Sequence, residues 1–251
     1  MYTLFVMAMM LLPSGEAGGK VLKADERVNI LLNTTCHRET ATFPRCEASG
    51  NNCAFMVKDG MFEDWVPGRI LEIANKGFMT RPLVGGPGLV DVNTGYIRDS
   101  GGLDNLFSKM NEGADIFTSD DFAVYGRTIT TLKESIEELF GLEELFFTAP
   151  TFITRLDGRS DWEPKEEHDE YWHSHVDRLN TAHYHYSGLL YLSDFDKDFT
   201  NGRFVLLDSD GDEELILEPR AGRVALFSSG EEHEHYVERL GSGARYVLSF
   251  W

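Results

Sequence analysis

The C-terminal segment, residues 222–251, reads GRVALFSSGEEHEHYVERLGSGARYVLSFW. Apolar or alternating residues fill 222–228, 234–239 and 244–250, and short polar or glycine-containing turns separate these runs. Runs of this length, with turn residues between them, are typical of β-strands in sandwiches and barrels. The segment therefore predicts three short strands.

The same texture extends upstream as far as residue 151. Closely spaced short strands of this kind suggest a sandwich or a double-sheet jelly roll. The further runs that predict strands are 151–156, 171–177, 183–193, 203–207 and 214–218.

Two helices are predicted before the strands. The sequence TSDD at 118–121 has the pattern of a capping box, and apolar residues then recur at three- and four-residue spacing up to Gly141. An earlier helix is predicted with Pro67 in its first turn and Gly77 as its C-terminal stop. We therefore expect an α+β fold, a double-stranded β-helix (jelly roll) supported by N-terminal helices.

The rest of the N-terminal half has weaker patterns. Residues 20–60 are polar and irregular, and residues 80–102 are rich in turn residues. The sequence GGPG at 85–88 is predicted to be a plain turn, because no Lys-Ser/Thr follows it as in a phosphate-binding loop.

The N-terminus resembles a targeting segment. Residues 1–12, MYTLFVMAMMLL, have the length of a signal-peptide core and are too short to span a bilayer. We predict that residues 1–19 are a signal peptide or a truncated membrane anchor; a short buried helix is the alternative. The glycosylation sequon NTT at 33–35 and three nearby cysteines favour the secretory pathway, in the endoplasmic reticulum lumen or membrane, over the cytoplasm. The cysteines, which allow one disulfide and one free thiol, are Cys36, Cys46 and Cys53.

The composition is that of a soluble globular protein with an acidic surplus. The 251 residues are 42% hydrophobic and include 42 acidic against 23 basic side chains, for a net charge of -19. This balance argues against nucleic acid as a partner, because phosphate binding draws on clustered lysine and arginine. It is compatible with the attraction of a basic substrate.

Histidines concentrate in the predicted β region, where seven of the eight lie between residues 168 and 235. His175 and Asp177 are two positions apart, and a strand would place both side chains on one face. One more imidazole would complete a 2-His-1-carboxylate set, which suits Fe(II) and leaves metal positions open. The candidates for this third ligand are His233 and His235.

Arg245 supplies a charge near the same predicted site. It follows His235 by ten residues, across the turn GSG at 241–243, so a hairpin would return it toward the metal pocket. A fixed guanidinium there can bind a carboxylate in a bidentate manner. A metal with open positions and an anchoring arginine together describe a 2-oxoglutarate site.

Several longer motifs, taken together, strongly resemble Fe(II)/2-oxoglutarate-dependent oxygenases of the prolyl 4-hydroxylase type. The resemblance covers roughly residues 118–251 and extends more weakly back to Cys36. The motifs that carry it are EYWHSHVD at 170–177, SGLLYLS at 187–193, NGRFV at 201–205, EPRAGR at 218–223, SGEEHEHYVER at 229–239 and RY at 245–246.

The resemblance implies roles for five residues. His175, Asp177 and His235 match the iron ligands of the family, and Arg245 matches the basic residue that binds the distal carboxylate of 2-oxoglutarate. Tyr191 matches a strand tyrosine that hydrogen-bonds the same carboxylate. The implied cofactors are Fe(II), 2-oxoglutarate as co-substrate and ascorbate (vitamin C).

The resemblance also implies an organisation and an activity. Residues 20–117 would be a cysteine-containing, helical support region, and 118–251 the dioxygenase domain, with a jelly-roll core at about 151–251. Such an enzyme uses 2-oxoglutarate and O₂ to hydroxylate a C–H bond of a peptide or small molecule, and it releases succinate and CO₂. We expect a basic substrate and, through residues 1–19, membrane attachment.

Two alternatives stay open at this point. The chain could be a non-catalytic jelly roll that keeps a metal for structure. It could also be a cupin-like metal-binding module that does not use 2-oxoglutarate, in which His173 and His175 would form the metal-binding pair.

Overall fold

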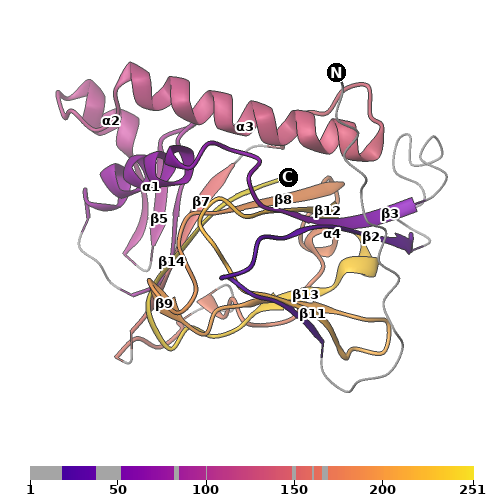
Figure 1. Cartoon of the computed structure of the whole chain (residues 1–251). Coiled ribbons are helices and arrows are strands. Elements are labelled where there is room, and N and C mark those ends of the chain that lie inside the picture. The colour runs from indigo at the N-terminus through magenta and orange to yellow at the C-terminus, as the bar shows by residue number, and fades with distance from the viewer. Residues whose placement is uncertain are drawn as a thin grey trace.

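The fold consists of two facing β-sheets, with helices over the outer face of the larger sheet (Figure 1). This computed structural model describes residues 19–37, 52–81, 85–99, 101–148, 151–159, 161–165 and 169–251. The predicted α+β jelly-roll class is confirmed. The predictions for residues 1–18 and for Cys46 lie outside the described residues.

The smaller sheet has four strands, and β1 pairs in parallel with β11 while the other pairs are antiparallel. In spatial order the strands are β1 (Lys20–Leu22), β11 (Glu213–Leu217), β10 (Phe204–Leu207) and β13 (His235–Val237).

The larger sheet has ten strands. Seven of the eight predicted strands are present across the two sheets, as β7, β8 and β10 to β14, most of them shorter than predicted. In spatial order the larger sheet contains β2 (Asn29–Thr35), β3 (Asn52–Lys58), β12 (Val224–Ser228), β8 (Tyr186–Tyr191), β14 (Ser242–Phe250), β7 (Phe152–Gly158), β4 (Gly86–Val90), β5 (Tyr96–Asp99) and β6 (Gly102–Asn105), with β9 (Phe199–Thr200) paired to β14.

Helix α3 (Ser119–Phe140) confirms the capping-box prediction. The Thr118 hydroxyl accepts a hydrogen bond from the Asp121 amide, the Asp121 carboxylate accepts one from the Thr118 amide, and Gly141 ends the helix in the left-handed conformation. The other helical segments are α1 (Trp65–Phe78), α2 (Leu106–Asn111), α4 (Asp177–Asn180) and the 3₁₀ turn Glu231–His233.

Gly77 is not the stop that the sequence suggested, because α1 continues through it and ends at Phe78. A Cβ at Gly77 would lie 2.9 Å from Cγ2 of Val90 in β4. The glycine therefore allows α1 to pack closely on the sheet, and its role is contact with a neighbour rather than termination.

The central strands of the larger sheet are buried on both faces. Leu190, Leu226 and Leu248 belong to the apolar cluster that includes α1 and α3, whereas their neighbours Tyr191 and Phe227 belong to the cluster between the two sheets. Because side chains alternate along a strand, every second residue of β8, β12 and β14 points between the sheets. That inner layer is where the candidate site lies.

The irregular structure expected for residues 20–60 is wrong, because β1, β2 and β3 occupy much of this range. In β3 both faces are buried, so its sequence NCAFMVK shows no alternation. β2 is the edge strand beside it and is exposed over its last residues.

The plain turn predicted at 85–88 is also wrong, because β4 begins at Gly86 and pairs with β7. Gly86 has φ +72°, and a Cβ there would lie 2.3 Å from the indole ring of Trp162. The glycines accommodate this indole and a left-handed backbone, which is why they resemble a turn.

Strands from 20–117 and from 151–251 are hydrogen-bonded into the same sheets. β1 pairs with β11, β3 with β12 and β4 with β7. The division at residue 117 stays a prediction.

The disulfide joins Cys36, which follows β2, to Cys53 in β3, and their Cα atoms are 4.9 Å apart.

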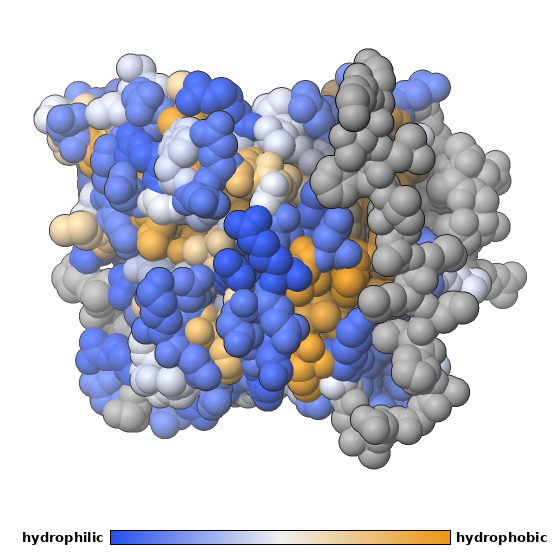
Figure 2. Space-filling model, in the orientation of Figure 1, coloured by the Kyte–Doolittle hydropathy of each residue, from blue (hydrophilic) through white to orange (hydrophobic). Residues whose placement is uncertain are grey.

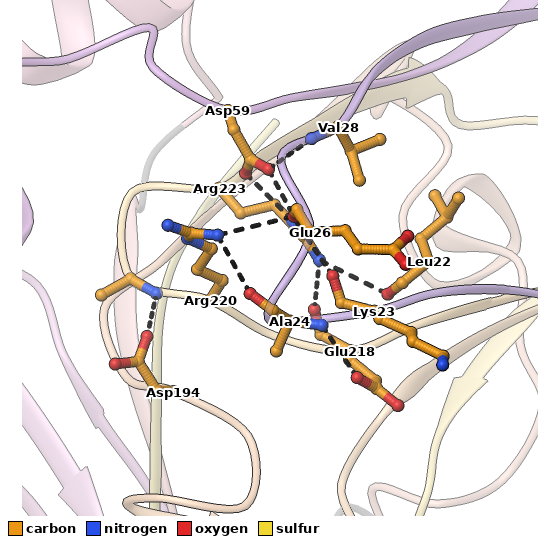
Figure 3. Close-up of polar contacts among 11 residues, drawn as sticks. Leu22, Lys23, Ala24, Glu26, Val28, Asp59, Asp194, Glu218, Arg220 and Arg223 are labelled. Atoms are coloured by element: carbon orange, nitrogen blue, oxygen red, sulfur yellow. Dashed lines mark hydrogen bonds and ion pairs between the residues drawn. The ribbon is translucent and has the colours of Figure 1, made fainter.

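Arg223 fastens the N-terminal segment to the sheets (Figure 3). Its guanidinium is fully buried and binds the Asp59 carboxylate through Nε at 3.0 Å and Nη2 at 2.9 Å. Nη1 and Nη2 also donate to backbone carbonyls at the end of β1, in the chain just after it, and between β11 and β12. These carbonyl acceptors are Leu22, Lys23, Glu26 and Glu218.

We expect Arg223→Lys to lower the free energy of unfolding by about 3 kcal/mol, because a lysine cannot replace the bidentate pair and leaves buried acceptors unpaired. Urea unfolding of the two proteins measures the difference. Arg220→Lys is the control, since Arg220 is partly exposed and makes its hydrogen bonds to the carbonyls of Ala24 and Glu26. An equal loss in both variants would contradict the assigned role of Arg223.

Asp121 links α3 to α1 through a buried carboxylate. It lies 2.6 Å from Arg69 Nη2 and 2.6 Å from Lys76 Nζ. Burial raises the pKa of Asp121, but the bonds to Lys76 and Thr118 outweigh it, and the pKa lies below its ordinary value.

Asp121→Asn should therefore destabilise the protein by about 2 kcal/mol near neutral pH. Because the pKa of Asp121 is lowered in the folded protein, the ionised carboxylate stabilises the fold at every pH above the ordinary carboxyl pKa of about 4. This contribution is lost as the pH falls through the lowered pKa of the folded state. The difference between wild type and variant in urea unfolding should thus shrink as the pH falls below about 4. Asp120→Asn, at an exposed carboxylate that also contacts Arg69, should change stability by less than about 1 kcal/mol.

The visible surface is mainly hydrophilic, with apolar groups in smaller patches between polar ones (Figure 2). Large exposed apolar side chains such as Met79, Leu103 and Phe146 are spread over different elements. Such scattered side chains are ordinary on folded proteins. Among the described residues, no helix combines the length and the apolar character needed to cross a membrane.

Candidate metal centre

Three of the predicted ligands converge between the sheets. His235 begins β13, and His175 pairs with it by a single β-bridge in which each N–H donates to the other's carbonyl, at 2.8 and 3.0 Å. Asp177 is the first residue of α4. Two backbone devices, a bridge and a helix start, therefore bring these side chains together.

The strand predicted at 171–177 is wrong. Its one β-pairing is the bridge at His175, and the chain turns into α4 two residues later. β13 is three residues long, and β10 pairs along one of its edges. On the other edge only its first residue, His235, pairs with a residue of 171–177. His175 and Asp177 do meet, but not because they share a face of a strand.

The donor atoms are close enough to share one ion. One donor each from His175, Asp177 and His235 lie within 4.8 Å of one another. Asp177 Oδ1 is 3.7 Å from His175 Nε2 and 4.0 Å from His235 Nε2. In the part of the chain that the structure describes, no other group of three His, Cys, Asp or Glu side chains has this arrangement.

The other histidine candidates lie elsewhere. His233 is buried in the 3₁₀ turn, with Nδ1 2.8 Å from the carbonyl of Ser228. His173 is an exposed side chain whose Nε2 lies 2.8 Å from Glu170 Oε2, so it does not form the cupin-like pair with His175.

Backbone carbonyls orient both imidazoles of the cluster. His175 Nδ1 lies 3.0 Å from the carbonyl of His173, and His235 Nδ1 lies 2.8 Å from the carbonyl of His233. Because a carbonyl can only accept, each Nδ1 carries the proton and each Nε2 keeps its lone pair for a metal.

The carboxylate of Asp177 is held by serines that the sequence did not mark. Ser187 Oγ donates to Asp177 Oδ2 at 2.5 Å, and the hydroxyls of Ser187 and Ser229 are 2.7 Å apart. All three side chains are buried. Both serines fall inside the quoted motifs, yet their spacing carries no signal of this contact.

Burial lowers the pKa of His235 to about 4, although the negative charge of Asp177 opposes the shift. The imidazole is therefore neutral near physiological pH. The neutral imidazole is the form that binds a divalent metal.

Arg245 approaches the cluster from the opposite sheet. The predicted hairpin is wrong: β13 pairs with β10 in the smaller sheet, whereas β14, which carries Arg245, pairs with β7 and β8 in the larger one. The chain crosses between the sheets after β13. Arg245 and the three metal donors line one cavity of about 1010 Å³.

The Arg245 guanidinium is buried, at 4% exposure, and forms no ion pair among the described residues. Its Cζ lies 5.4 Å from the centroid of the Tyr191 ring. Arg245 Nε and the Tyr191 hydroxyl are both buried without a hydrogen-bond partner in the described structure. Burial raises the pKa of Tyr191 to about 12, so its hydroxyl remains a donor.

This pair matches an anionic ligand. Burial lowers the pKa of Arg245, but a guanidinium stays charged in proteins. A buried cation without an anion is unfavourable, and a carboxylate in the cavity that Arg245 lines would neutralise its charge. Tyr191 lies beside the guanidinium but is not among the residues that line the cavity.

Comparisons with known proteins agree with this geometry. Residues 165–251 match the family described as "2OG-Fe(II) oxygenase superfamily". Over 184 residues the chain is 36% identical to mouse (Mus musculus) "2-oxoglutarate and iron-dependent oxygenase domain-containing protein 3", covering 72% of this chain and 57% of that protein. The Xenopus tropicalis protein of the same name is 29% identical, over 87% of this chain and 68% of its own length.

A solved structure shows the same fold. A prolyl 4-hydroxylase from Phytophthora capsici superposes with a TM-score of 0.51 and 18% identity, covering 82% of this chain and 59% of that one. The chain spans 57% of the length of the mouse relative. Residues 165–251 belong to the 2OG-Fe(II) oxygenase superfamily.

Proposed function

We propose that this protein is an Fe(II)- and 2-oxoglutarate-dependent dioxygenase that hydroxylates a C–H bond, in the manner of prolyl 4-hydroxylases, and releases succinate and CO₂. One observation carries the proposal. Three metal donors and a buried arginine without a counter-ion line the same cavity.

The donor set fits ferrous iron. Two imidazoles and one carboxylate are the ligands typical of non-haem Fe(II) oxygenases, and they leave positions for other ligands. His175 Nε2, His235 Nε2 and Asp177 Oδ1 would hold the ion. Bound iron together with 2-oxoglutarate and O₂ supplies the oxidising power for C–H hydroxylation.

The opposite wall fits 2-oxoglutarate. Arg245 would bind the distal carboxylate, and the Tyr191 hydroxyl would donate a further hydrogen bond to it. Leu189, Phe204 and Val247 line the cavity around these groups and limit the access of water. Because the walls there are apolar, the charged pair between Arg245 and the carboxylate would be screened weakly.

The substrate we propose is a peptide with basic side chains. The cavity continues over the inner face of β4 and β7, where Pro87, Leu89 and Phe152 form an apolar wall. A peptide substrate is favoured by the solved neighbour, which is a prolyl 4-hydroxylase. Besides Asp177 and Arg245, the carboxylates at the cavity are Asp99, Asp169 and Glu170, against the cations Arg98 and Lys165.

Added salt should lower kcat/KM for a lysine-containing peptide more than for its neutral counterpart, because salt screens attraction by the acidic surface. Initial rates over a series of NaCl concentrations measure this. Equal salt dependence for the two peptides would contradict a basic substrate.

The experiment that tests the function is succinate formation from 2-oxoglutarate by Fe(II)-loaded protein in air, with a peptide library as substrate. Wild type should form succinate and add one oxygen atom to a peptide, whereas His175→Ala should not. Lys197→Ala is the control and should behave as wild type. Lys197 is exposed, pairs with Asp194 and is not among the residues that line the cavity. Absence of succinate formation by the wild type, with and without peptides, would overturn the proposal.

We further propose that the protein works in the secretory pathway and uses ascorbate to keep its iron reduced. The disulfide between Cys36 and Cys53 supports an oxidising compartment, and Asn33 of the sequon is exposed on β2. Glycosidase treatment of protein from secretory cells should shift its mass. Omission of ascorbate should shorten the period of linear turnover. Membrane attachment stays a prediction.

A further inference from the structure

A pair of buried hydroxyls lies behind the carboxylate of the candidate metal centre. We propose that Ser187 is a positioning residue, which holds Asp177 with one oxygen toward the metal and one toward the protein, and that Ser229 orients Ser187. The inference rests on the proposed metal site. It adds two residues to the site that do not themselves reach the ion.

The contacts divide the two oxygens of Asp177. Oδ1 lies 3.7 and 4.0 Å from the Nε2 atoms of His175 and His235, on the metal side. Oδ2 accepts the hydrogen bond from Ser187 Oγ at 2.5 Å. This hydrogen bond fixes the rotation of the carboxyl group and favours metal binding through Oδ1 alone.

The backbone of Asp177 needs this support. Asp177 opens α4, which is four residues long, so little helix holds the residue in place. Ser187 sits on β8, a central strand of the larger sheet, and is 1% exposed. The hydroxyl therefore ties a ligand on a short element to a rigid one.

Ser229 completes the connection. Its hydroxyl lies 2.7 Å from that of Ser187, and since Ser187 donates to Asp177, the hydrogen between the two serines belongs to Ser229. The backbone of Ser229 is fixed as well: its N–H donates to the carbonyl of His185 and its carbonyl accepts from the amide of Arg178 in α4. Successive hydrogen bonds in a buried chain strengthen one another.

The test is the affinity for Mn(II), titrated by calorimetry without 2-oxoglutarate or substrate. Ser187→Ala should weaken Mn(II) binding by about 10- to 100-fold, the range found for residues that orient metal ligands. Ser229→Ala should weaken it several-fold, and adding it to Ser187→Ala should have little further effect, because both act through one hydrogen bond. Ser249→Ala is the matched control, a buried serine on β14 that does not contact Asp177, and its Kd should stay within about twofold of wild type.

Two further readouts separate positioning from general damage. The visible absorption of bound Co(II) should change in Ser187→Ala and not in Ser249→Ala, because the carboxylate coordinates differently. In the active enzyme, KM for Fe(II) should rise far more than kcat falls at saturating Fe(II). If circular dichroism shows that metal-free Ser187→Ala is unfolded, the Mn(II) affinity of Ser229→Ala is compared with that of Ser249→Ala instead.

The inference would be overturned if Ser187→Ala bound Mn(II) as tightly as Ser249→Ala. If Ser187→Ala does not fold, an unchanged Mn(II) affinity of Ser229→Ala would overturn it. Neither result would touch the proposed function, which requires the metal and not the serines. Conversely, the wild type could form no succinate while Ser187→Ala shows the expected loss of Mn(II) affinity. That result would overturn the enzyme proposal and leave the positioning role standing.

Discussion

Replacement of Asp177 by alanine should reduce 2-oxoglutarate-dependent succinate formation by about 10³-fold or more, equivalent to over ~4 kcal/mol. Asp177 is the one carboxylate in the cluster, beside two imidazoles. Without it, the third donor is lost. Initial rates at saturating Fe(II) and 2-oxoglutarate measure the effect.

The matched control for Asp177→Ala is Asp99→Ala. Asp99 also lines the cavity but pairs with Arg81 at 3.3 Å and belongs to no group of metal donors. It should retain 2-oxoglutarate turnover measured without a peptide substrate. Retention of more than about a tenth of the rate in Asp177→Ala would contradict the assignment of Asp177 as a ligand.

Replacement of Arg245 by methionine should raise KM for 2-oxoglutarate by about 100- to 1000-fold, because a buried charge pair with two parallel hydrogen bonds is lost. Arg245→Lys keeps the charge but not the planar fork, so its KM should lie between the two. Rates over a range of 2-oxoglutarate concentrations, at saturating Fe(II), give the values.

Arg155→Met is a suitable control for Arg245→Met. Arg155 is similarly buried, at 9% exposure, but it lies on the helix side of β7, paired with Asp157. Its replacement should affect stability and leave KM for 2-oxoglutarate near the wild-type value. An Arg245→Met KM within about threefold of wild type would instead favour a metal module that does not use 2-oxoglutarate.

The sequence predicted the elements that carry a local signal. Helix α3 has an apolar stripe, a capping box and a terminal glycine, and all three are local features. β3 lies in a polar, irregular stretch of sequence without such a pattern, and its assignment depends on pairing with β12 far along the chain. β4 begins with glycines that serve the distant Trp162.

The composition of the candidate site could be predicted, whereas its construction could not. Motifs identified His175, Asp177, His235 and Arg245, but the expected strand and hairpin are absent. A bridge, a helix start and a crossing between sheets bring the side chains together instead. These devices, like the contact of Ser187 with Asp177, depend on tertiary structure and leave no local signal.

The most direct test of the central claim is a crystal structure of the protein with Mn(II) and 2-oxoglutarate, grown without oxygen. We predict one metal ion bound by His175 Nε2, His235 Nε2 and Asp177, and a 2-oxoglutarate whose distal carboxylate is paired with Arg245. A metal bound elsewhere, or a metal in this cluster with no 2-oxoglutarate at Arg245, would contradict the account.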